Sequence, residues 1–185
     1  MALNSAQYDK SLLRSCGNDV FISANVEIRR PQLVSVGEHV AIDTGFYLTT
    51  QAEIGDYIHI APYVTIIGGA DAELHMAHFS SIAAGSRIIC ASDDHMGAGM
   101  PGPTIPAEYH DNVTYAPVIF ERFAAVGTNV IVMPGVTLAE GSVVGAGSLI
   151  TKNTEPWTIY VGTPARAVKV RPREKILENA RLMGY

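Results

Sequence analysis

Large apolar side chains recur every sixth residue along most of this chain. A small or apolar residue follows most of them four positions later, and glycine directly follows several. The recurring positions are Val36, Ile42, Leu48, Ile54, Ile60 and Ile66, then Met76, Ile82 and Ile88, then Phe120, Val126, Val132, Leu138, Val144 and Ile150. A period of six matches neither a helix, with a period of about 3.6, nor simple strand alternation, with a period of about 2. It matches a parallel β-helix, in which the chain winds around a triangular prism with one short strand per face.

The pattern defines the expected domain organisation. Three hexads make one turn of the prism, and stacked turns repeat at roughly 4.8 Å, the spacing of hydrogen-bonded strands. We expect five to six turns in a coil domain at 20–158, a cap at 1–19 and a C-terminal segment at 159–185. Arg30-Pro31-Gln32 is expected to add residues at a corner, and Gly68-Gly69-Ala70-Asp71 marks a shift of register.

Both ends of the chain are expected to carry a short helix. Residues 5–15 are consistent with an N-terminal helix capped by Ser5, with Leu12 and Leu13 facing the body. The chain is expected to leave the prism after Trp157. It would then form a helix from about Pro172 to Met183, which ends at Gly184.

The stretch 92–116 breaks the repeat with prolines and glycines. We expect it to form a long protruding loop. Loops of this length are uncommon in compact domains and usually have a function.

Composition narrows the classes of function. The 185 residues are 48% apolar and 17% charged, which favours one folded domain over a disordered chain. The net charge of −5 makes nucleic acid an unexpected partner. Cys16 and Cys90 form neither a disulfide framework nor a zinc-ligand pattern. No apolar run approaches the ~20 residues that cross a bilayer, and the N-terminus does not resemble a secretory signal. We therefore expect a cytoplasmic protein without membrane insertion.

Three blocks near the C-terminal end carry a family resemblance: MPGVTL, VGAGSLITK and VGTPARAVK. With the upstream IGDYIHIAPYVTI, they resemble the hexapeptide-repeat acyltransferases over roughly residues 20–173. The likeness is to the galactoside O-acetyltransferase branch, although ASDDH and its Pro-rich loop look more like the sugar-nucleotide group. The resemblance implies a left-handed coil and a homotrimer with active sites between subunits. It also implies transfer of an acyl group from acetyl-CoA or another acyl-CoA. The acceptor would be a hydroxyl or amine of a sugar or nucleotide-linked amino sugar. Surface-polysaccharide biosynthesis would be its setting.

The same resemblance assigns coenzyme contacts. Thr128, Ala146, Thr151 and Lys152 would lie beside the pantetheine and phosphates, with Arg166 and Lys169 near the 3′-phosphate. The charge distribution agrees, because six of the thirteen Lys and Arg residues lie in the last twenty positions, and phosphate favours such donors. The alternative is a solvated basic tail.

His95 is the candidate general base. Attack of a hydroxyl on a thioester requires a proton acceptor, and imidazole, with a reference pKa near ~6.5, suits that task. His95 stands where the coil gives way to the loop, matching the catalytic histidine of the family, and Asp93 or Asp94 could orient it. With an amine acceptor, Asp94 and a water would suffice, and His95 would be secondary.

Other polar residues are candidates for the acceptor site. His59 and His78 fall on neighbouring coils, and Tyr109 and Tyr115 lie in the loop. The short spacing of His75 and His78 raises the alternative of a carbonic-anhydrase-like metal enzyme, or a non-catalytic scaffold, on the same fold. The histidine spacing of those anhydrases is missing here, so no metal is expected.

Ala125 marks a departure from the galactoside enzymes, which carry a tryptophan there. We hypothesise that the wider slot admits an acyl group larger than acetyl.

Overall fold

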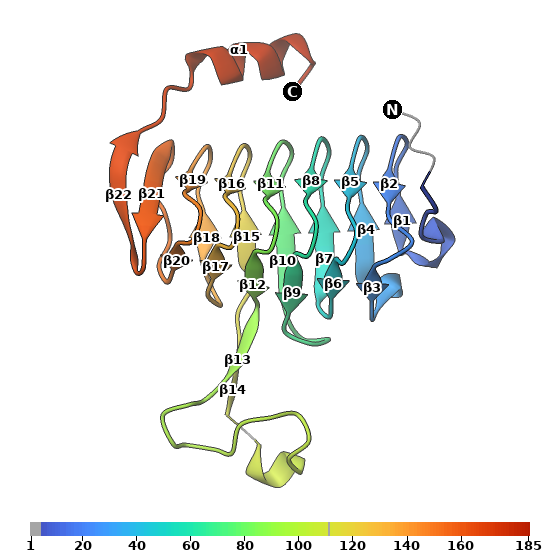
Figure 1. The fold of residues 1–185 in the computed structure, drawn as a ribbon, viewed down its shortest axis with the longest axis vertical. Coiled ribbons are helices and arrows are strands. Elements are labelled where there is room, and N and C mark those ends of the chain that lie inside the picture. Colours follow the sequence, from blue (N-terminus) through green and yellow to red (C-terminus); the bar gives the residue numbers. More distant parts are fainter. Residues whose placement is uncertain (1–4, 111) are drawn as a thin grey trace.

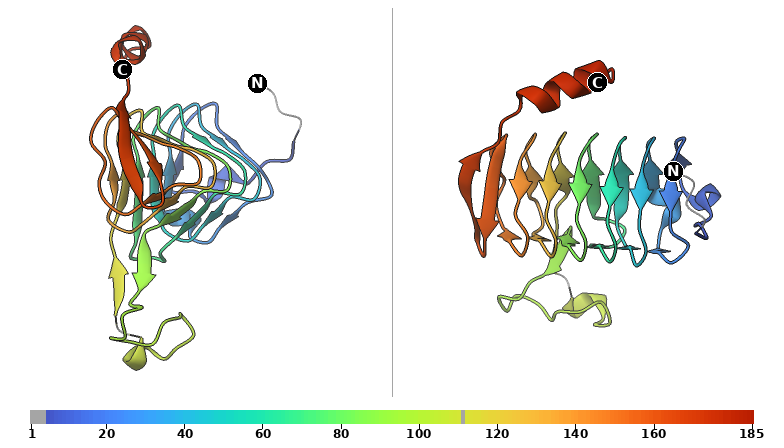
Figure 2. Two further views of the ribbon diagram at one scale, coloured as in Figure 1. Left: turned by 60° about the vertical axis from the view of Figure 1, so that its left-hand side comes forward. Right: turned by 45° about the horizontal axis from the view of Figure 1, so that its top comes forward.

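The computed structural model describes residues 5–110 and 112–185 and consists of a parallel β-coil with three flat faces (Figures 1 and 2). The first sheet contains β1 (Ser15–Cys16), β4 (Val34–Val36), β7 (Gln51–Ile54), β10 (Glu73–Met76), β15 (Val118–Phe120) and β18 (Thr137–Leu138). The second contains β2 (Phe21–Ile22), β5 (Ala41–Ile42), β8 (His59–Ile60), β11 (Ser81–Ile82), β16 (Ala125–Val126), β19 (Val143–Val144), β21 (Thr158–Gly162) and β22 (Ala165–Val170). The third contains β3 (Glu27–Ile28), β6 (Tyr47–Leu48), β9 (Thr65–Ile67), β12 (Arg87–Ile89), β17 (Ile131–Val132) and β20 (Leu149–Ile150).

The column of apolar residues forms the core. All fifteen recurring positions are buried, and within each sheet they stand in register, as in the pairing of Ile42 with Ile60 and Ile60 with Ile82. Burial of a large aliphatic side chain stabilises a fold by about 1.5–3 kcal/mol, so this column provides the main driving force for coiling. The prediction of a hexapeptide coil is confirmed.

Most coils advance by eighteen residues. The last turn is shorter, since Val143 pairs with Ile159 (159 − 143 = 16), and the residues added to other turns are all inserted at one corner. Val34 pairs with Ala52 (52 − 34 = 18), but Glu27 pairs with Tyr47 (47 − 27 = 20). Ala52 pairs with Leu74 (74 − 52 = 22), and Arg87 pairs with Ile131 (131 − 87 = 44). The extra residues follow β3, β9 and β12, each time between the third sheet and the first. We name this corner the arm edge.

The largest insertion is a projecting arm rather than an irregular loop (Figure 1). Its base is an antiparallel ladder of β13 (Ala91–Asp93) and β14 (Val113–Tyr115), and a 3-10 helix, η3 (Ala107–Tyr109), lies beyond it. The ladder therefore adds regular structure at both ends of the predicted loop 92–116.

The N-terminal helix is shorter than expected. Only a 3-10 turn forms, η1 (Lys10–Leu12), and Asp9, not Ser5, caps it by accepting a hydrogen bond from the Ser11 N–H. Leu13 is buried, but Leu12 is 51% exposed. The preceding backbone instead pairs with the first coil, where the Tyr8 N–H donates to the carbonyl of Ile22. A second 3-10 turn, η2 (Pro31–Leu33), forms the expected corner insertion. Residues 1–4 of the predicted cap lie outside the described residues.

The C-terminal segment differs in where it leaves the coil. β21 still pairs in parallel with β19, so the second sheet continues beyond Trp157, and β22 then folds back antiparallel. Helix α1 spans Glu174–Leu182, so it begins two residues after Pro172 and ends one residue before the expected Met183, with the expected Gly184 just beyond it at a positive φ. Figure 1 shows α1 and the arm on opposite sides of the coil.

An aromatic column lines the corner between the first and second sheets. His39, Tyr57, Phe79, Phe123 and Trp157 follow one another there, with ring centroids 4.6, 5.1, 5.2 and 5.9 Å apart. Each of the five adopts a positive φ, a strained backbone conformation for such residues that the stacked rings offset. The C-terminal Tyr185 packs edge-on against Tyr57 and Phe79, which attaches α1 to this corner.

We predict that Gly141→Ala destabilises the protein more than Gly147→Ala. Both glycines have nearly the same φ, +67° and +68°, so both variants incur a left-handed penalty of about 1–2 kcal/mol. A Cβ at Gly141 would also overlap the Trp157 ring, whereas at Gly147 it meets nothing within 4 Å. The overpacking adds roughly 1–3 kcal/mol. Urea unfolding at one protein concentration measures the difference, and equal midpoints would contradict the packing argument.

Candidate functional site

A pocket of about 410 Å³ opens where the arm joins the coil, and all three corner insertions contribute to it. We name it the arm-base pocket. Its lining comprises Arg29, Arg30, Tyr47, Thr49, Ile67, Gly68, Gly69, Ala91, Ser92, Asp93, Pro103, His110, Val113 and Tyr115. Two of the predicted site residues, Asp93 and Tyr115, therefore line one pocket.

Asp93 is held by the arm itself. The Nε2 of His110 lies 2.7 Å from its Oδ1, and the N–H of Gly102 donates to its Oδ2 at 2.8 Å. The hydrogen bond from His110 is the main cause that lowers the pKa of Asp93, followed by smaller contributions that include the charge of His95. Asp93 is therefore a fixed carboxylate at neutral pH. The sequence offered His95 as its partner, but the ladder of β13 and β14 brings His110 there instead.

Asp94 and His95 lie further along the arm. Asp94 accepts hydrogen bonds from the N–H groups of Met96 and Ala98, at 2.6 and 3.0 Å, which orient both of its oxygens. His95 is exposed and makes no hydrogen bond within the part of the chain that is described. The arm thus carries a carboxylate held by the backbone and, next to it in sequence, an exposed imidazole.

A second cavity, of about 440 Å³, lies at the C-terminal end of the coil and brings together three of the predicted coenzyme residues. Thr151, Lys152 and Arg166 line this end cavity with Ile150, Asn153, Tyr160, Ala165 and Ala167. Thr128 and Ala146 lie elsewhere, at the corner between the second and third sheets. Lys169 is exposed on β22 and does not line the cavity.

The arm and the end cavity share one edge of the coil. Residues 151–154 follow β20 at the arm edge, as the arm itself follows β12. Hydrogen bonds link neighbouring turns along this edge: the Gly135 N–H donates to the carbonyl of Ala116, and the Thr137 N–H donates to Asn153. β12 and β20 are two strand spacings apart in the third sheet, roughly 10 Å along the coil.

The predicted acceptor residues outside the arm-base pocket are dispersed. His78 lies against Tyr185 beside α1, where its Nδ1 accepts a hydrogen bond from the Asp56 N–H. His59 pairs with Asp43 at 2.8 Å on the second sheet. Tyr109 is 59% exposed in η3. Within this one chain the structure does not bring these residues to Asp93.

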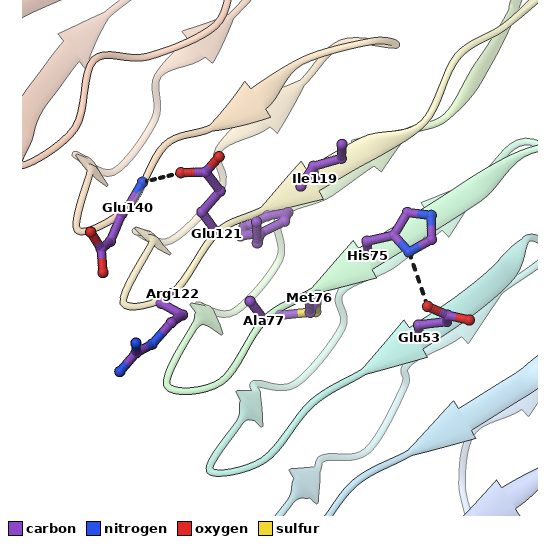
Figure 3. Close-up of a pocket in the computed structure, with 9 residues that line it drawn as sticks. Glu53, His75, Met76, Ala77, Ile119, Glu121, Arg122 and Glu140 are labelled. Carbon is purple, nitrogen blue, oxygen red and sulfur yellow. Dashed lines mark hydrogen bonds and ion pairs between the residues drawn. The ribbon is translucent and has the colours of Figure 1, made fainter. Parts of the chain in front are cut away.

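A third cavity, of about 480 Å³, lies on the first sheet but contains none of the predicted site residues (Figure 3). His75 pairs there with Glu53 at 3.3 Å, and the Glu140 N–H donates to Glu121 at 2.7 Å. No group of three or more His, Cys, Asp or Glu residues suited to a metal occurs among residues 5–110 and 112–185. No helix in those same ranges is long and apolar enough to cross a bilayer.

Cys90 lies buried at the foot of the arm but is not a nucleophile. Burial raises the pKa of its thiol to about 12, so it stays protonated at neutral pH.

Sequence reasoning missed Arg29 and Arg30 as site residues. It placed His110 in a polar, aromatic cluster of the loop with Tyr109 and Tyr115, a candidate sugar site, but did not pair it with Asp93, because that contact depends on the pairing of β13 with β14. The two arginines belong to the first corner insertion, which was recognised as an irregularity of the repeat but not as part of a pocket.

Comparison with known proteins agrees with this architecture. The family described as "Hexapeptide repeat of succinyl-transferase" matches residues 117–152. An Escherichia coli protein, dTDP-4-amino-4,6-dideoxy-D-glucose acyltransferase, is 31% identical over 180 residues, which cover 95% of this chain and 91% of that protein. The chain therefore belongs to the hexapeptide-repeat acyltransferase family, whose members are CoA-dependent enzymes.

Solved structures extend the likeness to the whole fold. AntD, an N-acyltransferase from Bacillus cereus solved with dTDP and 3-hydroxybutyryl-CoA, superimposes with a TM-score of 0.90 at 35% identity, over 97% of this chain and 98% of that one. The hexapeptide-repeat acetyltransferase VCA0836 from Vibrio cholerae gives a TM-score of 0.59 at 18% identity, over 88% of this chain and 77% of that one, and supports the fold alone. The fold is the expected left-handed β-helix.

We predict that His110→Ala raises the pKa of Asp93 toward the ordinary value of ~3.9, because the variant removes the main donor to the carboxylate. The native pKa is depressed, so the pair stabilises the fold above the unfolded-state pKa, and this contribution is lost as pH falls through the native pKa. Carboxyl carbon NMR titration measures the shift. Asp19, whose pKa is lowered by His39, serves as the unchanged control. An unmoved Asp93 titration would show that His110 does not set its charge.

Proposed function

We propose that this protein transfers an acyl group from an acyl-CoA to the amine of a nucleotide-linked amino sugar. The main support is the position of two cavities at the arm edge of the coil, one of which is lined by Asp93 of the arm. Relatives similar over nearly the whole chain support it: one is named as a dTDP-amino-sugar acyltransferase, and another was solved with dTDP-4-amino-4,6-dideoxyglucose and coenzyme A.

The reaction requires one proton acceptor near the nitrogen. The amine attacks the thioester carbon, the carbon–sulfur bond breaks, and the thiolate leaves as the nitrogen loses a proton. We assign Asp94 as the first acceptor of that proton, directly or through a water, because its oxygens are held in place by the backbone. The proton ends on the departing thiolate. His95 is the secondary base, and Asp93 is the fixed charge that orients the amine.

The coenzyme would enter from the end cavity. Lys152 and Arg166 supply charge for its phosphates, with Thr151 beside them, and the pantetheine would run along the arm edge toward the arm. We keep Thr128, Ala146 and Lys169 as coenzyme contacts of a neighbouring subunit's site, because they face outward from this chain.

The acyl group can be larger than acetyl. Ala125 stands on the second sheet between Ser81 and Val143, and its methyl side chain occupies much less room than a tryptophan. The AntD complex with 3-hydroxybutyryl-CoA is consistent with a wider slot in a similar protein.

We also propose a homotrimer that acts in the cytoplasm. Three of the side chains that project from the second sheet are small, Ala41, Ser81 and Ala125, and we assign this sheet as the face on which another copy packs. His59, His78 and Tyr109 would then contribute to acceptor sites between subunits. The product, an acylated nucleotide sugar, is an activated glycosyl donor, and we place it in surface-polysaccharide synthesis.

We predict release of free CoA thiol when the protein is mixed with dTDP-4-amino-4,6-dideoxyglucose and acetyl-, propionyl- or hydroxybutyryl-CoA. Asp94→Asn should lower kcat by at least ~100-fold, the lower range of general-base contributions, and His95→Asn by less than ~10-fold. The Asp94→Asn rate should recover partly as pH rises, because a larger fraction of the substrate ammonium is then already deprotonated to the nucleophilic amine.

No turnover with any acyl donor would contradict the proposed function. If His95→Asn lowers kcat more than Asp94→Asn does, His95 is the main base instead. If only acetyl-CoA is used as a donor, only the proposal that Ala125 makes room for a larger acyl group fails.

We predict that Lys152→Ala and Arg166→Ala each weaken CoA binding by about 3–30-fold, because each removes a charge-assisted donor to phosphate. Lys175→Ala, on α1 and paired with Glu178, is the matched control and should bind CoA normally. Isothermal titration calorimetry measures the dissociation constants. If Lys152→Ala and Arg166→Ala bind CoA with the same affinity as Lys175→Ala, the end cavity does not hold the coenzyme.

A further inference from the structure

The arm-base pocket has opposite charges at its two ends. Arg29 and Arg30 follow β3 at one end, and Asp93 belongs to the strand that continues β12 at the other. β3 and β12 are separated by three strand spacings in the third sheet, on the order of 14 Å along the coil. A nucleotide-linked amino sugar at neutral pH has the same polarity, with an anionic diphosphate in its middle and an ammonium on its sugar.

The arginines keep donors available for a phosphate. Arg29 uses its Nε on Glu27, at 2.8 Å, and lies over the Tyr47 ring at 5.4 Å. Arg30 is half-buried, and one terminal nitrogen donates to the Thr49 carbonyl at 2.8 Å. Each of these contacts fixes the plane of a guanidinium while leaving further N–H groups directed elsewhere. Pre-oriented guanidinium groups favour paired hydrogen bonds to phosphate oxygens.

The backbone of the second insertion forms the floor between the two ends. The N–H groups of Gly68 and Gly69 both donate to the Thr49 hydroxyl, at 3.1 and 3.3 Å, which holds this corner flat. A Cβ at Gly68 would lie 3.1 Å from the Ala91 nitrogen, so glycine permits the arm to start close to the coil. Tyr47 and Tyr115 supply aromatic surface on either side of this floor.

Asp93 gives the other end a fixed negative charge. Its contacts with His110 and Gly102 account for one hydrogen bond on each oxygen, and a carboxylate oxygen can accept a second. An ammonium presented along the floor therefore meets an acceptor that the arm has already oriented.

We infer that the arm-base pocket binds the acceptor lengthwise, with its diphosphate on Arg29 and Arg30 and its amino sugar on the Asp93–His110 pair. This inference rests on the proposed function for the identity of the acceptor. It adds Arg29 and Arg30 as the residues that bind the diphosphate, and it assigns His110 as the residue that positions Asp93. The pocket volume of about 410 Å³ is within the ~300–1,000 Å³ usual for small-molecule sites.

The test separates the two ends by direct binding. Calorimetry with dTDP on the full chain should show at least ~10-fold weaker binding for Arg29→Met and for Arg30→Met, with the CoA affinity unchanged. Arg30→Lys, which keeps the charge, should recover part of the loss. Arg14→Met is the matched control, since Arg14 is an arginine hydrogen-bonded to Ser35 outside the pocket.

Asp93→Asn should leave the affinity for dTDP unchanged and weaken only the binding of dTDP-4-amino-4,6-dideoxyglucose. His110→Gln should likewise weaken binding of the amino-sugar nucleotide relative to dTDP. Thermal unfolding checks that each variant is folded. Arginine variants that bind dTDP like the parent protein would overturn the inference even if acyl transfer is observed. Arginine-dependent dTDP binding without acyl transfer would leave it standing while the proposed function fails.

Discussion

The structure depends on the in-register stacking of one apolar column inside a three-sided coil. Each strand must pair with the strands one turn before and one turn after it, so additional residues cannot be placed within a face without breaking this register. They are tolerated only at corners, where the chain turns away from the ladder. All three insertions of this chain occur at the arm edge, and their residues meet in one pocket. The constraint that builds the core therefore also determines where a binding site can form.

The chemistry follows from what those insertions carry. The first brings two arginines, the second brings glycine backbone, and the third brings two adjacent carboxylates and two histidines. Hydrogen bonds within the arm fix Asp93 and Asp94 in different ways, one by a side chain and the other by the backbone alone. Two neighbouring carboxylates can therefore serve different roles, one as a fixed charge and the other as a proton acceptor.

Much of the fold could be predicted from the sequence because a coil repeats a local rule. Each hexad specifies its own strand and corner, and the apolar column from Val36 to Ile150 is buried as the spacing predicts. The prediction of an N-terminal helix was wrong. The first coil presents strand-edge backbone groups, and the segment around Tyr8 forms hydrogen bonds with them instead of forming a helix.

The candidate site was harder to predict because its contacts join distant residues. Asp93 and His110 are seventeen residues apart in the sequence (110 − 93 = 17). Their contact depends on the antiparallel pairing of β13 with β14, which does not follow the six-residue repeat. The aromatic column and its contact with Tyr185 likewise depend on the packing of separate turns. By contrast, Thr151, Lys152 and Arg166 lie in motifs that resemble a known family, and the structure places them around one cavity.

We propose that donor and acceptor meet along a single edge of the coil. The decisive measurement is a crystal structure of the Asp94→Asn variant with an acyl-CoA and dTDP-4-amino-4,6-dideoxyglucose. We expect continuous coenzyme density from the end cavity along the arm edge, nucleotide density over Arg29 and Arg30, and the sugar nitrogen facing the thioester beside the arm. Nucleotide density on the first-sheet cavity, or coenzyme density on a face remote from the arm, would contradict it.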